Sequence, residues 1–200
     1  MEEEKQIYHE KQCKELCALH ALNNLFQRAG TFQQTQLDAI CHSLAPNAWV
    51  NPHKSLLGLG NYDVNVLTRA LQCHGYEAVW FDKRKDPSCL ELRKIFGLIF
   101  NVSNEIRLGP LTLPLNKRHW FAIREIQAHY YNLDSKLEKP QLIGNKEELC
   151  DYLRQQLSVP DKLLFVVVDE NTAEQQAWLR QDTAPSEQSL ESVSGGRTCM

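Results

Sequence analysis

The hydrophobic positions of the chain follow a helical period up to about residue 75. Apolar residues there recur at spacings of three and four, which is the pattern of amphipathic helices with one buried face. Thr31 and Gln34 have the spacing of a capping box at the start of one such helix, and Asn61 is the expected cap of the next. We therefore predict three helices, at about residues 17–27, 31–44 and 62–74.

Beyond residue 75 the pattern changes to short runs that are rich in aromatic and β-branched side chains. Such runs, separated by Pro, Gly, Asn or charged residues, are typical of strands, and we predict them at about residues 76–81, 97–102, 119–126, 129–135 and 163–168. A further helix is expected at about residues 145–157, with Asn145 as its cap. Because helices come first and a meandering, antiparallel sheet follows, the predicted fold class is α+β.

The composition fits one globular domain with a polar tail. Of the 200 residues, 42% are hydrophobic and 24% are charged, and the net charge of −3 argues against a nucleic-acid partner. No apolar run approaches the ~20 residues of a membrane span, and the acidic N-terminus lacks the features of a signal peptide. We predict a domain over residues 1–168 and a largely disordered tail over residues 169–200, in which Trp178 could dock locally. We expect a monomer in the cytoplasm or the nucleus.

The cysteine content points away from disulfide bonds. The chain has seven cysteines, an odd number, and no two of them form a CxxC pair. Chains large enough to bury their own core seldom need a disulfide framework. Free thiols in a reducing compartment are the better interpretation, so each cysteine serves either packing or chemistry.

Cys17 is the cysteine whose position favours chemistry. It lies where the first predicted helix starts, and the free N–H groups and the dipole of a helix N-terminus stabilise a thiolate there. A thiolate is the form of cysteine that attacks a carbonyl carbon. The alternative is that Cys17 is a small buried hydrophobic residue, which is the commonest role of a free cysteine.

A histidine and an aspartate fall on one face of a predicted hairpin. His119 opens a predicted strand, where we expect it to be partly exposed and able to titrate near neutral pH. A two-residue turn at 127–128 would place Asp134 diagonally across from His119 on the same face, and a register shift of two residues would place them opposite each other. This is the base-and-orienter arrangement that a nucleophile requires. Asn132 lies on the same face and is the competing orienter, and a three-residue loop would break the pattern.

Two other features surround Cys17 in the sequence. Gln12 precedes it by five residues, and its side-chain amide could donate a hydrogen bond to the oxyanion that forms when a thiolate attacks. Alternatively, Cys13, Cys17 and His20 could bind zinc. Their spacing is not one of the common zinc patterns, however, and no well-placed fourth ligand follows. A zinc-binding module therefore stays the weaker hypothesis.

Four blocks of the sequence resemble the Josephin domain, a family of ubiquitin-specific cysteine proteases. The blocks occur in order at residues 8–12, 16–25, 117–120 and 131–135, and the resemblance covers about residues 7–168. The run from Gly58 to Val66 resembles the short, stand-alone members in particular. The resemblance implies a papain-like α+β fold and the cleavage of ubiquitin from conjugates.

The resemblance also implies roles for individual residues. Cys17 would be the nucleophile, His119 the general base and Gln12 the glutamine beside the oxyanion. Asp134 matches the third triad position, where the best-known family member has Asn. Val64 matches a position that contacts ubiquitin, and Trp120 is the other predicted substrate contact. The segment at 31–60 corresponds to a helical arm that is shorter here than in the larger relative, which leaves the preferred chain linkage undetermined.

The predicted function is therefore that of a deubiquitinating thiol isopeptidase. Its partners would be ubiquitin and ubiquitinated proteins, and no metal or organic cofactor is implied. The alternative from a different class is a ubiquitin-binding module that keeps the fold but has little or no turnover. A triad motif alone does not separate the two, because catalysis depends on the alignment of the side chains.

Overall fold

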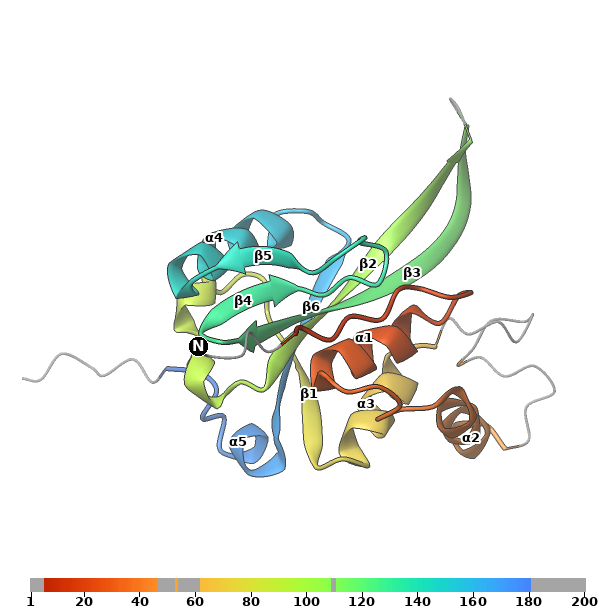
Figure 1. The fold of residues 1–200 in the computed structure, drawn as a ribbon, viewed down its shortest axis with the longest axis horizontal. Helices are drawn as coiled ribbons and strands as arrows, with labels where there is room; N and C mark the ends of the chain where they lie inside the picture. Colours follow the sequence, from red (N-terminus) through yellow and green to blue (C-terminus); the bar gives the residue numbers. More distant parts are fainter. Residues whose placement is uncertain (1–5, 47–52, 54–61, 109–110, 181–200) are drawn as a thin grey trace, which may run out of the picture.

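An antiparallel sheet of six strands forms the centre of the part of the chain that the structure describes (Figure 1). The computed structural model describes residues 6–46, 53, 62–108 and 111–180. The strands are β1 (Tyr76–Trp80), β2 (Gly97–Leu108), β3 (Leu111–Ile126), β4 (His129–Asn132), β5 (Gln141–Gly144) and β6 (Lys162–Asp169). Their spatial order is β1-β6-β2-β3-β4-β5, so β6 lies between the first two strands and the sheet is not the simple meander that we predicted.

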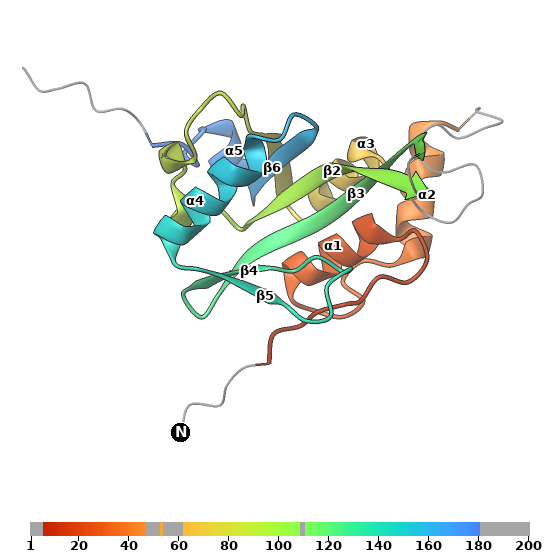
Figure 2. The ribbon, with the colours of Figure 1, turned by 90° about the horizontal axis from the view of Figure 1, so that it is seen from above.

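Helices cover both faces of this sheet. They are α1 (Cys17–Phe26), α2 (Gln34–Leu44), α3 (Val64–Gln72), α4 (Lys146–Leu157) and α5 (Glu170–Glu174). The first three gather on one side of the molecule and α4 lies on the other (Figures 1 and 2). Among the described residues, no helix is long and apolar enough to cross a membrane. The predicted α+β class is confirmed.

The predicted helix caps are right for α4 and wrong for α2 and α3. Asn145 is the N-cap of α4, as expected, and it forms a reciprocal capping box with the third residue of the helix. In α2, by contrast, Gln33 and Gln36 form the box, so the helix starts later than predicted. The cap of α3 is Asp63, whose carboxylate accepts the N–H groups of the second and third helical residues. An ionised carboxylate at this position also interacts favourably with the helix dipole, which favours Asp63 over an earlier start.

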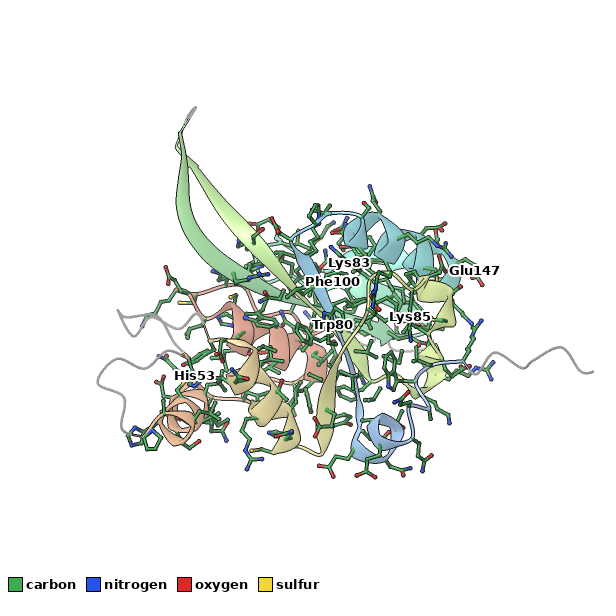
Figure 3. The ribbon with its side chains drawn as sticks, turned by 180° about the vertical axis from the view of Figure 1, so that it is seen from behind. His53, Trp80, Lys83, Lys85, Phe100 and Glu147 are labelled. Atoms are coloured by element: carbon green, nitrogen blue, oxygen red, sulfur yellow. The ribbon has the colours of Figure 1, made fainter. Side chains whose placement is uncertain are left out.

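Side chains alternate between two separate cores on the two faces of the sheet. Along β3, Trp120 and Ala122 pack beneath α1, whereas Phe121 and Ile123 pack on the side of α4. The same alternation runs along β6. Figure 3 places Phe100 inside the second core, while Glu147 points away from α4 on the outer surface. Both faces are covered, which explains why the central strands read as nearly continuous apolar runs.

The β3–β4 hairpin has a two-residue turn, and not the three-residue loop that the sequence also allowed. Ile126 pairs with His129, and the register continues to the pair of Ile123 with Asn132. The turn residues Gln127 and Ala128 have φ values of 51° and 62°, the left-handed conformation of a type I′ turn. Neither is Gly or Asn, so the turn is strained and is maintained by the strands that it joins.

Three strands of the sheet differ from the prediction: β2 and β3 are longer, and β5 was not predicted. β2 and β3 extend beyond the other strands as a two-stranded arm (Figures 1 and 2). As a result, β3 begins at residue 111, not at 119. The short edge strand β5 was missed, because its run of four residues carries too few apolar side chains to show a strand pattern.

Residues 169–180 pack on the domain, although we assigned them to the tail. The helix α5 follows β6 directly, and the backbone of the next segment pairs with the turn at Leu90 through Leu179. The side chain of Trp178 is only 6% exposed and lies in the core beside α4. One large aromatic side chain thus anchors a polar segment. Residues 181–200, where disorder is predicted, lie outside the described residues.

Candidate active site

Cys17 is the first residue of α1 and is nearly buried. It is 4% exposed, and its Sγ lies 3.9 Å from the carbonyl oxygen of Arg118. Leu16 occupies the N-cap without a side-chain hydrogen bond, and the first turn of the helix has no acidic residue. The N–H groups of this turn are therefore not neutralised, and the helix dipole favours a thiolate at Cys17.

His119 and Asp134 form the closest polar contact of the site. Nε2 of His119 lies 2.7 Å from Oδ1 of Asp134, and both side chains are largely buried. A carboxylate only accepts hydrogen bonds, so Nε2 carries the proton of this bond. The sulfur of Cys17 interacts with the same imidazole ring. The structure thus brings together the three residues predicted to form the triad.

The charges of the three groups support one another. Burial lowers the pKa of His119, but the hydrogen bond and charge of Asp134 and the interaction with Cys17 outweigh it, so the pKa is raised overall. Burial raises the pKa of Asp134, but the hydrogen bond and charge of His119 and the backbone N–H of Lys136 outweigh burial and lower it. Both shifts stabilise an imidazolium beside a carboxylate.

Asp134, and not Asn132, contacts the ring of His119. The side-chain oxygen of Asn132 accepts the backbone N–H of Asp134 at 3.0 Å, and its amide nitrogen donates to Gln141 and to the Tyr152 hydroxyl. Asn132 therefore supports the turn that carries Asp134 and does not contact the ring. This outcome follows from the register of the hairpin, in which β4 ends at Asn132 and the chain then turns toward His119.

The environment of His119 differs from the prediction. We expected a partly exposed histidine at the mouth of a strand, but His119 is 4% exposed and lies in the middle of the long strand β3. The reason is that β3 continues into the arm, so the strand does not begin at the site. Burial makes the contact with Asp134 more important, since a buried imidazolium without a carboxylate is costly.

Gln12 lies beside the loop that carries Asp134. Its backbone N–H donates to the carbonyl of Ser135 at 2.7 Å, and its side-chain Nε2 donates to the carbonyl of Lys14 at 3.0 Å. Its Oε1 is buried and has no hydrogen-bond partner. A side-chain amide has two N–H donors, so one donor is engaged by Lys14 and the other can serve an oxyanion. The arrangement is compatible with the predicted role of Gln12 and does not test it.

The structure contradicts one of the two predicted substrate contacts. Trp120 is 2% exposed and donates its indole N–H to the carbonyl of Tyr62 at 2.9 Å. It packs in the core beneath α1, so it cannot contact a bound protein, and the prediction is wrong for this residue. A strand residue next to His119 must point to the opposite face of the sheet, which is the physical reason. Val64 is the first residue of α3 and is partly exposed, and its role stays a prediction. Most of the predicted loop at 46–60 lies outside the described residues.

The weaker zinc hypothesis finds no support in the positions of its residues. Among the residues that the structure describes, no group of three or more His, Cys, Asp or Glu side chains is arranged to hold a metal ion. The ring of His20 instead contacts Glu10 and the backbone of Cys13. The sulfur of Cys17 lies near the carbonyl of Arg118, so neither Cys17 nor His20 is directed to a shared metal position.

The sequence analysis missed the polar residues that hold the N-terminal segment against α1. Asn24 is fully buried, and its side chain bonds the backbone of Glu10 and the carbonyl of Leu133. It therefore links the segment of Gln12 to the loop of Asp134. The signal was present in the sequence, because an asparagine in an otherwise apolar helix face, two turns after Cys17, needs a buried partner.

A thiol at a helix N-terminus, with a carboxylate-oriented histidine on an antiparallel sheet, is the site architecture of papain-like cysteine proteases. A comparison with family models matches residues 12–168 to Josephin. The chain therefore belongs to the Josephin family.

Individual relatives support the same assignment. The chain is 50% identical over 178 residues to a Josephin-like protein of Drosophila melanogaster, covering 86% of this chain and 80% of that protein. It is 47% identical over 176 residues to Josephin-2 of Homo sapiens, covering 88% and 93%. Ataxin-3 of Homo sapiens is 26% identical over 160 residues, covering 70% of this chain and 39% of that protein. The predicted resemblance to the short members of the family is confirmed.

Proposed function

We propose that this protein is a deubiquitinating thiol isopeptidase, which hydrolyses the bond between the C-terminus of ubiquitin and a lysine amine. The observation that carries the proposal is the contact of His119 with Asp134 at 2.7 Å, next to the thiol of Cys17 at a helix N-terminus. Membership of the Josephin family supports ubiquitin as the substrate.

The reaction proceeds in two halves, formation of a thioester and its hydrolysis, and Cys17 and His119 supply the nucleophile and the proton transfers of both. In the first, the Cys17 thiolate attacks the carbonyl of the terminal glycine, and the S–C bond forms. The His119 imidazolium then donates its proton to the lysine amine as the C–N bond breaks, which leaves a thioester. In the second half, neutral His119 removes a proton from water, whose oxygen attacks the thioester and releases the Cys17 thiolate.

We expect two groups to stabilise the oxyanion in both halves. The backbone N–H of Cys17 belongs to the first turn of α1, and the side-chain amide of Gln12 has a second N–H donor. Each tetrahedral intermediate develops negative charge on the former carbonyl oxygen, so donors fixed in advance act mainly in the transition state.

The decisive experiment uses a ubiquitin probe that carries a C-terminal electrophile. The wild-type protein is expected to form a covalent adduct with the probe, seen as a mass increase of one ubiquitin, and the adduct should map to Cys17. Binding without an adduct would instead favour the ubiquitin-binding module without turnover.

A substitution tests the nucleophile directly. Cys17→Ala should form no adduct and should lower the hydrolysis of a ubiquitin conjugate by roughly 10³-fold or more, because only the electrostatic part of the site remains. The matched control is Cys73→Ala, which changes an exposed cysteine and should leave hydrolysis unchanged. Cleavage by Cys17→Ala within tenfold of wild type would refute the proposal.

A further inference from the structure

A second histidine on α1 holds the segment that carries Gln12. The chain passes along α1 in the opposite direction before it reverses into the helix (Figure 1). Side chains of α1 and of its C-cap residue form hydrogen bonds with this segment at three places, between Gln27 and Tyr8, between Asn24 and Glu10, and between His20 and Cys13. The contact of His20 is the one nearest to Gln12 in sequence.

Both ring nitrogens of His20 are occupied. Nδ1 lies 2.7 Å from a carboxylate oxygen of Glu10, and Nε2 accepts the backbone N–H of Cys13 at 3.2 Å. A carboxylate only accepts and a backbone N–H only donates, so the proton of the neutral ring is on Nδ1. The ring is 8% exposed, which makes these two contacts its main polar environment.

Glu10 is itself fixed as an acceptor. Besides His20, it accepts hydrogen bonds from the Tyr8 hydroxyl and the Asn23 amide. Burial raises the pKa of the Glu10 carboxyl, but the hydrogen bonds from His20, Tyr8 and Asn23 outweigh it and leave the pKa below its ordinary value. Glu10 is therefore ionised at neutral pH and selects the tautomer of His20.

The same geometry rules out a second catalytic pair. Cys13 is exposed and lies next to His20, so a thiol–imidazole pair could be suspected. The ring, however, accepts the backbone N–H of Cys13, and its other nitrogen donates to Glu10. No ring nitrogen is left to remove a proton from the thiol, so the contact serves the backbone.

The backbone around Gln12 is thereby held from both sides. The N–H of Gln12 donates to Ser135, in the loop of Asp134, and the next N–H, that of Cys13, donates to His20 on α1. Lys14 follows in a left-handed conformation with a φ of 57°, which turns its carbonyl onto the Gln12 amide. Loss of either anchor would let the amide move relative to Cys17.

We propose that His20, with its tautomer selected by Glu10, is a positioning residue that places Gln12 for oxyanion stabilisation. This inference rests on the proposed function, since it assigns His20 an effect on the same reaction. His20 touches neither the substrate nor the reacting atoms. It acts through one backbone N–H, and its contribution should appear in kcat and not in the binding of ubiquitin.

Two substitutions separate the two contacts of the ring. His20→Asn places an amide where Nδ1 is, so it can still donate to Glu10 but cannot reach Cys13. His20→Gln places a carbonyl oxygen near the position of Nε2, so it can still accept the N–H of Cys13. We expect His20→Asn to lower kcat about tenfold with KM within twofold of wild type, because small misplacements of a donor are costly. His20→Gln should stay within threefold of wild type.

Two further readouts keep the test specific to Gln12. Alkylation of Cys17 by iodoacetamide forms no oxyanion, so its rate should be the same in all three proteins. In a Gln12→Ala background, His20→Asn should lower kcat by less than twofold, since the residue through which it acts is gone. Equal losses in the Asn and Gln variants, no loss in either, or a full additional loss without Gln12 would each overturn the proposal.

Hydrogen exchange separates this proposal from the proposed function. The amide of Cys13 should exchange faster in His20→Asn and at the wild-type rate in His20→Gln. If the wild-type protein does not hydrolyse ubiquitin conjugates, the proposed function fails, and the exchange of this amide alone decides whether His20 positions the segment. An unchanged amide in His20→Asn overturns the proposal whatever the activity is.

Discussion

At the scale of single residues, the charge of Asp134 is the feature that most affects the chemistry. Its Oδ1 lies 2.7 Å from Nε2 of His119. A carboxylate at this distance both orients the imidazole and stabilises its protonated form. The ion pair of the Cys17 thiolate and the His119 imidazolium should therefore persist to higher pH than it would with an amide at position 134.

Replacing the charge should move the pH profile in a known direction. Asp134→Asn keeps an acceptor for His119 but removes the carboxylate, so the pKa of His119 falls. The alkaline limb of the kcat/KM profile should move to lower pH, with activity within ~10-fold of wild type near neutrality. The measurement is a kcat/KM profile on a ubiquitin conjugate. A limb that does not move would show that the charge is not coupled to His119.

Removing the orienter altogether should cost more. Asp134→Ala leaves the imidazole free to rotate and should lower kcat by roughly 10²-fold. Asn132→Ala serves as the comparison, because Asn132 only supports the backbone of Asp134 and should cost less. The measurement is the steady-state kcat of the two variants. A larger loss of kcat in Asn132→Ala than in Asp134→Ala would make Asn132 the orienter.

Removal of the Gln12 side chain should lower kcat and leave KM nearly unchanged. Gln12→Ala removes one oxyanion donor, which typically costs about 10²-fold, and it leaves the surface that binds ubiquitin nearly intact. Separate kcat and KM values are needed. A change confined to KM would mean that Gln12 contributes only to the binding of substrate.

At the scale of elements, the β3–β4 hairpin determines where the base and its orienter meet. Its two-residue turn sets the register, and any one-residue slip would place Asp134 on the other face from His119. The turn residues themselves are unfavourable, because both have positive φ without being Gly or Asn. The site thus depends on a strained turn that strand pairing keeps in place.

Relief of this strain should stabilise the protein. Ala128 has a φ of 62° and is exposed, so Ala128→Gly removes a steric conflict and should raise the free energy of unfolding by about 0.5–1 kcal/mol. The same substitution at an exposed position in the interior of α2, Ala39→Gly, should lower it by about 1 kcal/mol. Urea denaturation of both variants measures the two effects, and a loss of stability in Ala128→Gly would contradict the strain.

At the scale of the whole molecule, the sheet divides the protein into two cores with different tasks. The core on the side of α1, α2 and α3 contains Cys17, while the core on the side of α4 contains Trp178 and the segment that follows β6. The nucleophile thus comes from α1, the base comes from β3, and the orienter comes from the loop after β4. A substitution in the core beside α4 should therefore change the free energy of unfolding without changing the catalytic activity of the folded protein.

Trp178 offers a test of this separation. Trp178→Ala should lower the free energy of unfolding by about 3 kcal/mol, at the low end for a buried tryptophan because its indole N–H has no partner. Activity per folded molecule should stay within twofold of wild type at low temperature. Thermal unfolding measures the loss of stability, and an active-site titration with the ubiquitin probe gives the activity per folded molecule. A minor loss of stability would show that the anchor is unimportant.

The sequence by itself determined those features that depend on neighbours along the chain. The start of α1 at Cys17 and the cap of α4 at Asn145 follow from short windows of sequence, and the residues at 127–128 allowed the two-residue turn that the structure has. The periods of the apolar residues also sufficed for the α+β class. The physical reason is that caps, turns and hairpin registers are set by hydrogen bonds and backbone sterics over a few residues.

Only the tertiary structure decided the features that depend on distant segments. The position of β6 between β1 and β2, the burial of His119 and Trp120, the docking of Trp178 and the contact of His20 with Cys13 are examples. Each arises where two segments meet across the sheet or along α1. Burial and long-range pairing are properties of the packed chain, because the free energy that selects them comes from surface removed from water between elements and not from any one element.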